Sequence, residues 1–528
     1  MLKTGNNLSG RNSGKTNCKL WSVLGNRKKG KTNGRVRSNQ EGTFPLRSRQ
    51  FNREDNVITL NPIFLYLSIS LSLSPFHFRY YFLEDSEESF HRAISPILWW
   101  AQLFGLLPLS GISANLPSSL KFKKISFRTA YAVVVAASIF VMAILSIIHM
   151  IRTLNAESFV VRGGIAAATA GAIFYGNGLF GTIMFIWLSP RWVILQNDWK
   201  AMERFIDSNK YQRPRLRWKF IIISSVILFF ALFEHILSII NHSINFEWGT
   251  RNSTFANFLH IYTVKSHNFI LESVDYSYTL GIYIFIVSKI ATFVWNFTDL
   301  FVMLVSTGLA ERYKTLNKRL FDTTKKNANN VDWGEFRNDY AILSSLVKKV
   351  DNDISPITLL SFANNLYFIC LQLLNGLSGP EGGNILSNIY FFFSFAFLIL
   401  RTCAVTLLTA RINDQSKTVL PLLYNCSSST YDIETQRLQY QLTTDDISLT
   451  GLRFFSITRN FMLAVSSFYS FIYIYICVCV CVTMCLLYFY EEEKKSYEEF
   501  NVLANRSDHN VRGRASSIQR CYVKLNQW

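Results

Sequence analysis

Charged residues and prolines are scarce in this chain. Only 17% of its 528 residues are Asp, Glu, Lys or Arg and only 11 are proline, whereas 49% are hydrophobic and 44 are phenylalanine. A typical soluble domain has about a quarter of its residues charged. The shortage of charge excludes an ordinary soluble protein and predicts a polytopic membrane protein, whose apolar surface faces lipid.

Enzyme motifs are also missing. No HExxH or GxSxG sequence occurs, and the eight histidines are scattered; His149, His235 and His242 lie at the ends of apolar runs, where an interfacial position is expected. Residues 25–32 match GxxxxGK[ST], but they lack the buried strand that a phosphate-binding loop follows. We therefore predict no enzymatic activity and no cofactor.

Cysteine usage indicates neither disulfides nor a metal site. Three of the nine cysteines fall in a short Cys-Val repeat and a fourth, Cys485, closely follows it, while Cys370 and Cys403 lie inside apolar runs. No paired extracellular framework is visible, and no histidine or carboxylate lies within the repeat to complete a metal site. The net charge of +19 comes mostly from the first fifty residues and from short polar loops. That distribution is typical of membrane orientation, so we predict no nucleic-acid binding.

Apolar segments recur along the chain at intervals that suit membrane helices. About 20 consecutive apolar residues cross a bilayer as a helix. The sequence predicts an all-α, seven-transmembrane helix bundle with spans at residues 130–150, 164–188, 220–241, 278–305, 357–377, 386–410 and 461–490.

Basic residues predict the orientation of these spans, because Lys and Arg are retained in cytoplasmic loops. Seven lie between residues 191 and 217 and nine between 312 and 349, whereas the loop after the fifth span has none. The N-terminus is therefore predicted to be cytoplasmic and the C-terminus extracellular, inverted relative to G-protein-coupled receptors. Asn241 and Asn252 begin glycosylation sequons in the third loop, which this orientation places outside.

One tripeptide resembles the Asp/Glu-Arg-Tyr signature of G-protein-coupled receptors. Glu311, Arg312 and Tyr313 follow the predicted fourth span, whereas that signature ends the third span. We interpret the tripeptide as an ordinary charged helix end that emerges into the cytosol. Residues 90–112, which hold a Trp pair and two prolines, are predicted to form a cytoplasmic interfacial segment before the first span.

Both ends of the chain differ in composition from its middle. Residues 1–89 are predicted to be a disordered basic region, and their Leu-Ser alternation at 65–74 is what a dinucleotide repeat encodes, which points to a gene-model artefact. Ile-Tyr alternation at 472–476 passes into Cys-Val alternation at 477–482. We interpret residues 466–528 as a translated intron that replaces the last span and adds a polar tail. Residues 90–465 form the predicted transmembrane domain.

Several motifs in this domain resemble one receptor family. They are FVWNFTD at 293–299, NNLYF at 364–368, RTCAV at 401–405 and GLRFFSITRNFMLAV at 451–465. Together they resemble the sugar (sweet-taste) clade of insect gustatory receptors. The resemblance implies a sugar-gated, non-selective cation channel that passes monovalent and divalent cations. It also implies a homo- or hetero-tetramer with other gustatory receptor subunits in the plasma membrane of sensory neurons, with the last helix lining the pore.

The alternative function is a seven-span chemoreceptor that signals through G proteins. Because the family's Thr-Tyr and Gln-Phe ending is missing after residue 465, the chain as written is predicted not to conduct.

Candidate site residues follow from polar groups inside or beside the spans. Lys289, Asn296 and Asp299 share one face of the fourth span, and Arg401 lies at a comparable depth in the sixth. We predict a structural intramembrane ion pair between Asp299 and Arg401. A neutral polyol needs hydrogen-bonding groups in a mostly apolar cleft. Candidates for the sugar site near the outer ends of the spans are Glu272, Asp275, Tyr276, Gln372, Asn375, Glu234 and His235.

Overall fold

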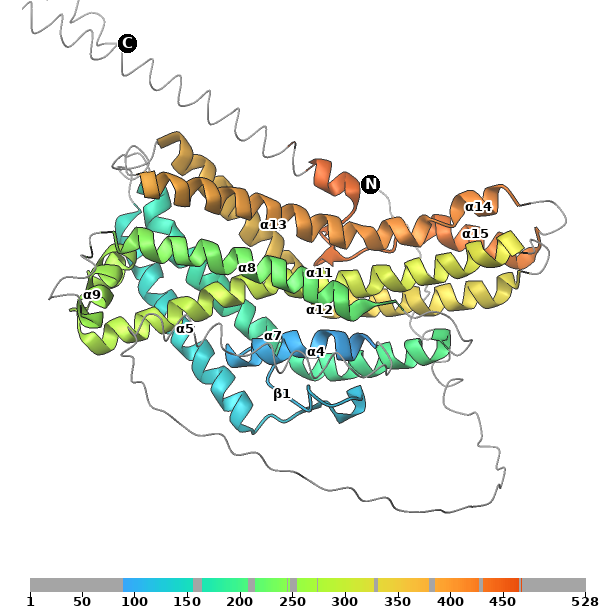
Figure 1. Cartoon of the computed structure of the whole chain (residues 1–528), viewed down its shortest axis with the longest axis horizontal. Coiled ribbons are helices and arrows are strands. Elements are labelled where there is room, and N and C mark those ends of the chain that lie inside the picture. The colour runs from blue at the N-terminus through green and yellow to red at the C-terminus, as the bar shows by residue number, and fades with distance from the viewer. Residues whose placement is uncertain are drawn as a thin grey trace, which may run out of the picture. The chain divides into compact units, whose positions relative to one another are not determined.

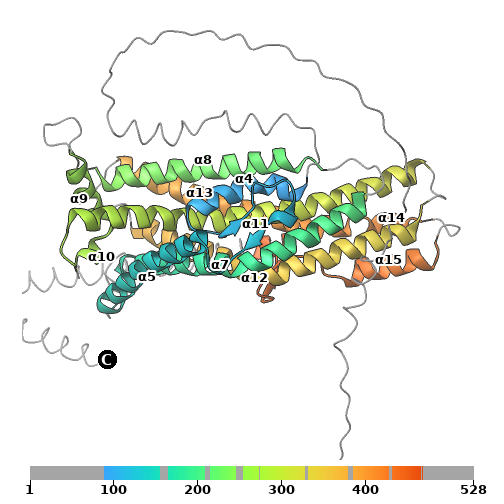
Figure 2. The ribbon, with the colours of Figure 1, turned by 90° about the horizontal axis from the view of Figure 1, so that it is seen from below.

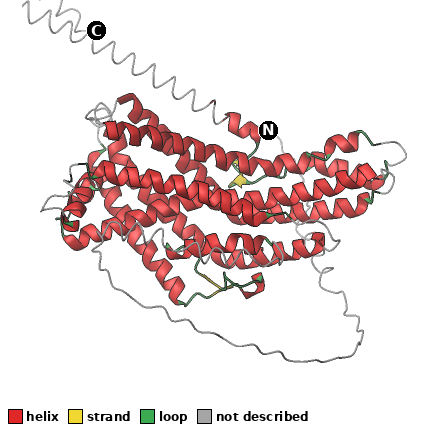
Figure 3. Ribbon diagram, in the orientation of Figure 1, coloured by secondary structure: helices red, strands yellow, loops and turns green. Residues whose placement is uncertain are grey.

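The computed structural model is a bundle of long helices with two very short β-hairpins (Figures 1 and 3). It describes residues 89–154, 164–207, 214–244, 246, 254–272, 274–326, 331–378, 385–426, 431–464 and 467. Residues 1–88 of the predicted disordered region therefore lie outside the described residues, as do the repeats and the tail after residue 467.

Among the described residues, six helices are long and apolar enough to cross a membrane. They are α5 (Phe127–Thr153), α7 (Gly164–Ile206), α8 (Leu216–His242), α11 (Tyr278–Lys326), α12 (Trp333–Ser378) and α13 (Ile385–Lys417). These helices contain the first six predicted spans. Nearly all of the predicted seventh span, 461–490, lies outside the described residues.

Four of the six helices are much longer than the predicted spans. α7, α11, α12 and α13 contain 43, 49, 46 and 33 residues, whereas about 20 suffice to cross the hydrocarbon core. The basic stretches that we expected to be loops are therefore largely helical, and α7 continues to Ile206 past the predicted end at residue 188. Pro190 lies within α7 and Pro356 within α12, so neither proline ends its helix.

α11 is the central helix of the bundle. It packs against α13, α12, α7, α8, α9 (Phe255–Ser266), α5 and α4 (Phe90–Leu103). Residues 300–305 of α11 are fully buried all round the helix, as expected for an interior helix that is apolar on every side. In Figure 2, α11 and α12 run alongside each other towards α15 (Ile433–Thr444).

α4 is packed into the bundle, although we expected an interfacial segment here. Ser89 caps its N-terminus by accepting a hydrogen bond from the Arg92 amide. Phe90 is fully buried and stacks on Trp199 of α7 with ring centroids 3.7 Å apart. Trp99, on the other face, remains 42% exposed. The helix is amphipathic, so one face contacts α7 and α8 and the other is free to meet lipid headgroups.

The remaining elements are short connections. β1 (Leu109–Ser110) pairs antiparallel with β2 (Lys121–Phe122), and a 3₁₀ turn, η2 (Pro117–Ser119), lies between them. β3 (Thr450–Gly451) pairs with β4 (Phe455–Ser456) just before residue 461. α10 (Asn268–Leu271) follows α9, and α14 (Leu420–Tyr424) precedes α15.

Candidate functional site

A buried ion pair joins α11 to α13 in the middle of the bundle. Nε of Arg401 lies 2.9 Å from Oδ2 of Asp299, and the two side chains are 2% and 0% exposed. The Nε–H is not aligned for a hydrogen bond, so this contact is ionic. Asp299 accepts hydrogen bonds from Ser361 Oγ at 2.5 Å and Asn365 Nδ2 at 3.1 Å. Arg401 donates to Oδ1 of Asn296 at 2.5 Å and to Oδ1 of Asn365 at 3.2 Å.

This arrangement pairs both buried charges and hydrogen-bonds most of their remaining polar atoms. A buried charge is tolerated when it is paired and when its remaining donors and acceptors are hydrogen-bonded. The two groups predicted to pair are therefore brought together by the structure, and Asn296 from the same face of α11 joins them. Lys289, the third residue predicted on that face, points to a different partner.

A second polar group lies about 10 Å further along α11, seven residues before Asn296. We call it the outer cluster, after the side on which the predicted orientation would place it. The outer cluster consists of Glu234, His235, Tyr262, Lys289 and Ser394. Lys289 Nζ donates to the Tyr262 hydroxyl at 2.7 Å and lies 4.6 Å from the centre of that ring. Glu234 Oε1 accepts from Ser394 Oγ at 3.0 Å. Nε2 of His235 is buried and has no hydrogen-bond partner among the described residues.

Four elements build the outer cluster. Glu234 and His235 come from α8, Tyr262 from α9, Lys289 from α11 and Ser394 from α13. It thus supplies a carboxylate, an ammonium group, two hydroxyls, an unpaired imidazole nitrogen and an aromatic ring between membrane helices. Donors, acceptors and aromatic surface of this kind are what a small polar ligand requires.

The other predicted sugar-site residues lie at the periphery. Glu272 is exposed and its Oε2 contacts Nδ1 of His149 at 2.8 Å. Asp275 is exposed between α10 and α11, and Tyr276 is half-buried edge-on to His260. Gln372 is half-buried on α12 and makes no hydrogen bond with another candidate within the described part of the chain. The side chain of Asn375 lies outside the described residues. Of the seven candidates, only Glu234 and His235 belong to the outer cluster.

Sequence reasoning missed Tyr262, Ser394 and the role of Lys289. Tyr262 lies in the third loop, in a helix that the span pattern did not predict, and a serine in an apolar helix carries no signal of its own.

Beside α9, the His267 ring contacts the Tyr175 hydroxyl through Nε2 at 2.6 Å and Ser266 Oγ through Nδ1 at 2.6 Å. Burial, with smaller effects of Lys289 and His242, lowers the pKa of His267 to about 3, so this imidazole is neutral.

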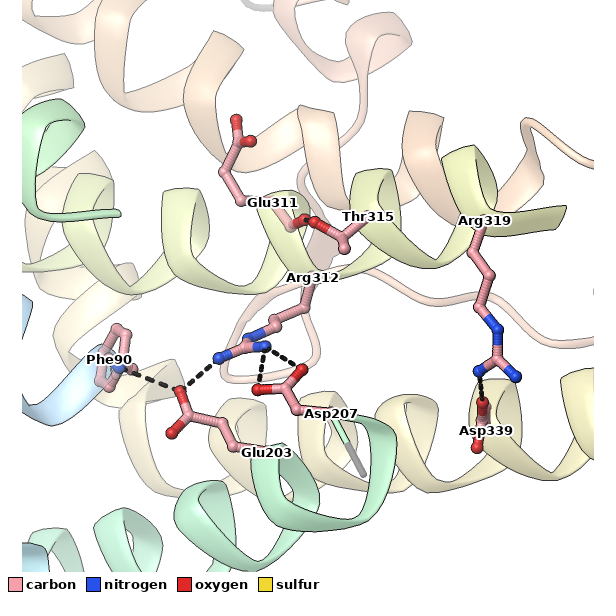
Figure 4. A network of polar contacts seen from close by, with 8 residues as sticks. All are labelled: Phe90, Glu203, Asp207, Glu311, Arg312, Thr315, Arg319 and Asp339. Carbon is pink, nitrogen blue, oxygen red and sulfur yellow. Dashed lines mark hydrogen bonds and ion pairs between the residues drawn. The ribbon is translucent and has the colours of Figure 1, made fainter. Parts of the chain in front are cut away.

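The Glu311-Arg312-Tyr313 tripeptide is not the helix end that we expected. α11 continues to Lys326, and all three residues are buried. Arg312 contacts Glu203 of α7 at 2.7 Å and Asp207, which directly follows α7, at 2.9 Å. Figure 4 shows the arginine between these two carboxylates.

Each residue of the tripeptide binds a different neighbour, because consecutive helix positions point about 100° apart. Glu311 pairs with Arg411 of α13 at 2.6 Å and with Lys219 of α8. The hydroxyls of Tyr313 and Ser344 of α12 lie 2.9 Å apart. Glu203 also accepts from the Phe90 amide at 2.9 Å, which ties α4 to the same level (Figure 4). We call these contacts the inner clasp.

This chain is similar to known proteins in sequence and in fold. A family model described as trehalose receptor matches residues 77–475. Gustatory receptor for sugar taste 64f of Drosophila melanogaster is 33% identical over 387 residues, which cover 72% of this chain and 79% of the relative. Gustatory receptor 5a for trehalose, from the same species, is 32% identical over 388 residues, 73% of this chain and 83% of the relative.

A solved structure extends the likeness to three dimensions. The insect olfactory receptor OR5 from Machilis hrabei superposes with a TM-score of 0.52 over 73% of this chain and 99% of its own. The two sequences are 15% identical, so this match establishes the fold alone. The family match covers three quarters of the chain and includes every motif on which the sequence resemblance rested. The chain therefore belongs to the trehalose-receptor family, the sugar receptors among insect gustatory receptors.

Proposed function

We propose that this protein is a subunit of a sugar-gated, non-selective cation channel in the plasma membrane of sensory neurons. Its family membership and its olfactory-receptor fold support this proposal. The N-terminus is cytoplasmic and the predicted seventh helix leads outward, as the basic residues indicate. Subunits assemble as homo- or hetero-tetramers around a central pore.

The outer cluster is the proposed sugar site, and it is the observation that carries the proposal. Glu234 and Ser394 offer acceptors to sugar hydroxyls, Lys289 and the Tyr262 hydroxyl offer donors, and the Tyr262 ring offers an apolar face. A neutral polyol that binds here loses its hydrogen bonds with water and forms hydrogen bonds with these side chains instead. Its binding competes with the Lys289–Tyr262 and Glu234–Ser394 contacts, which join α11 to α9 and α8 to α13. Sugar would therefore loosen the contacts between helices on the outer side.

Sugar-evoked current in cells that lack functional G-protein signalling tests the channel. Trehalose is the first probe, because one relative is named for it. The variants Glu234→Gln and Lys289→Met remove one partner each and should raise the half-maximal sugar concentration about 5- to 150-fold, which corresponds to roughly 1–3 kcal/mol. Lys265→Met, an exposed lysine of α9, is the matched control and should leave the response unchanged.

Three outcomes would count against the proposal in different ways. A response that vanishes with G-protein signalling indicates a receptor that acts through G proteins. Unchanged dose responses in Glu234→Gln and Lys289→Met, with losses in Glu272→Ala or Gln372→Ala, would move the sugar site to the periphery while the channel function stands. Unchanged responses in all four variants would mean that the site lies elsewhere in the bundle.

A further inference from the structure

The short segment that leads into the first membrane helix carries an unpaired positive charge. This segment, residues 121–128 (KFKKISFR), is here called the entry segment. Lys121, Lys123 and Lys124 are all exposed, and none forms an ion pair with any residue that the structure describes. By contrast, Lys219 and Arg411 in the inner clasp both pair with Glu311.

Two large apolar side chains stand beside these lysines. Ile125 is 98% exposed and Phe127 is 88% exposed, so neither packs on the bundle. Phe127 is also the first residue of α5, which crosses the membrane. Basic residues interleaved with exposed apolar residues at the start of a membrane helix are typical of a surface that lies in the headgroup region.

The entry segment is held in a fixed conformation. The carbonyl of Lys121 accepts from Ser110 Oγ at 2.9 Å within the β1–β2 hairpin, and the carbonyl of Lys123 accepts from Thr129 Oγ1 at 2.8 Å. Ser126 caps α5 by accepting from the Thr129 amide at 3.2 Å. Arg128 donates to the Leu109 carbonyl. Because the backbone is already ordered, binding a partner costs little further conformational entropy.

We propose that the entry segment binds the headgroups of anionic phospholipids in the cytoplasmic leaflet. This inference rests on the proposed orientation, which places the start of α5 at the cytoplasmic surface. The three lysines contact the phosphates, and Ile125 and Phe127 insert at the boundary between headgroups and acyl chains. Anionic lipids of that leaflet attract clustered lysines next to a membrane helix. A soluble phosphate would leave both apolar side chains in water, so a lipid fits the surface better.

The test measures lipid binding to the full chain in neutral detergent micelles. The probes are a fluorescent phosphatidylinositol 4,5-bisphosphate and, as the neutral reference, fluorescent phosphatidylcholine. The triple variant Lys121→Gln, Lys123→Gln, Lys124→Gln should lose affinity for the anionic lipid by a factor on the order of 100 at low ionic strength, about fivefold per lysine. The corresponding triple arginine variant should keep that affinity, because it keeps the charge.

Matched controls separate this surface from general electrostatics. Lys314, Lys318 and Lys325 are exposed lysines of α11, and their replacement by Gln removes the same charge elsewhere. This control should bind the anionic lipid like the wild type. Ile125→Ser should weaken lipid binding and leave the weak binding of water-soluble inositol trisphosphate unchanged. Unchanged lipid affinity in the entry-segment triple, equal loss in the α11 triple, or inositol trisphosphate binding as tight as the lipid would each overturn the proposal.

Discussion

Arg401 and Asp299 meet inside the bundle with Nε 2.9 Å from Oδ2, and both are almost completely buried. They lie on α13 and α11, and Ser361 and Asn365 of α12 complete the shell around the carboxylate. One ion pair therefore connects three membrane helices. Removing one partner would leave the other charge buried without compensation, which costs far more than the pair contributes by itself.

Asp299→Asn and Arg401→Gln should each destabilise the folded protein by about 3–5 kcal/mol and reduce the yield of assembled receptor. The double variant Asp299→Arg, Arg401→Asp exchanges the two charges and should recover only part of the loss. Ser361 and Asn365, which now donate to the carboxylate, would then face an arginine. Size-exclusion profiles and thermal unfolding in detergent measure both effects. Arg437→Gln breaks an exposed pair with Glu434 and serves as the control, with little expected change. Strictly additive losses in the double variant would argue against pairing.

Arg312→Gln should also destabilise the protein, because it leaves Glu203 of α7 and Asp207, directly after α7, without their buried cation. We expect a loss of about 3–5 kcal/mol in the same unfolding assay. Arg312→Lys keeps the charge but cannot reach both carboxylates with a planar fork, so an intermediate loss is expected. If Arg312→Gln unfolds like the wild type, the inner clasp contributes nothing to stability.

Glycosylation should occur at Asn252 and not at Asn241. The structure places Asn241 in the last turn of α8, where its Oδ1 accepts from Ser387 Oγ of α13 at 2.7 Å. Ser243 of the same sequon is buried and donates to the Ile239 carbonyl. Asn252 lies outside the described residues, before α9. Loss of the glycosidase-sensitive mobility shift in Asn252→Gln, and its retention in Asn241→Gln, is the expected pattern.

The same experiment reports on the orientation. Protease protection in microsomes should leave residues 190–219 accessible from the cytosolic side. A protected segment there, or the absence of any glycan, would contradict the cytoplasmic N-terminus.

Acid should destabilise the protein through His267. Its pKa is lowered from 6.5 to about 3 in the folded state, chiefly by burial. Below pH 6.5 His267 therefore binds a proton in the unfolded chain but not in the folded chain, and the free energy of unfolding decreases as the pH falls from 6.5 towards 3. The loss between pH 7 and pH 5 should reach about 2 kcal/mol from this residue. His267→Gln should flatten the dependence of Tm on pH over this interval; an equal slope in both proteins would exclude His267 as the cause.

The segment after residue 465 can be checked in the transcript. We predict that the mature message from sensory tissue splices after the codon for Val465 and restores a Thr-Tyr and Gln-Phe ending. The chain printed here should then give no sugar-evoked current, whereas the spliced form should conduct. The family model matches as far as residue 475, ten residues further than the resemblance read from the sequence. A mature message that keeps the codons for 472–482 in frame would contradict the prediction.

Apolar length and residue pattern were sufficient to predict the membrane class and six of the described helices, and the motifs that resemble sugar gustatory receptors were sufficient to predict the family. They were also sufficient to place Asp299 and Asn296 on one face of α11, because helical periodicity decides which residues share a face. Opposite charges at similar depths then made Arg401 the expected partner, since an intramembrane charge needs one.

Only the tertiary structure decided which helix each face meets. Lys289 shares the face of Asp299 but pairs with Tyr262 of α9, and Arg312 pairs with residues more than a hundred positions earlier. Periodicity carries no information about such contacts, because they depend on how separate helices pack. The same limit explains the misjudged helix ends. Pro190 and Pro356 lie inside continuous helices because neighbouring helices can compensate for the backbone hydrogen bonds that proline removes.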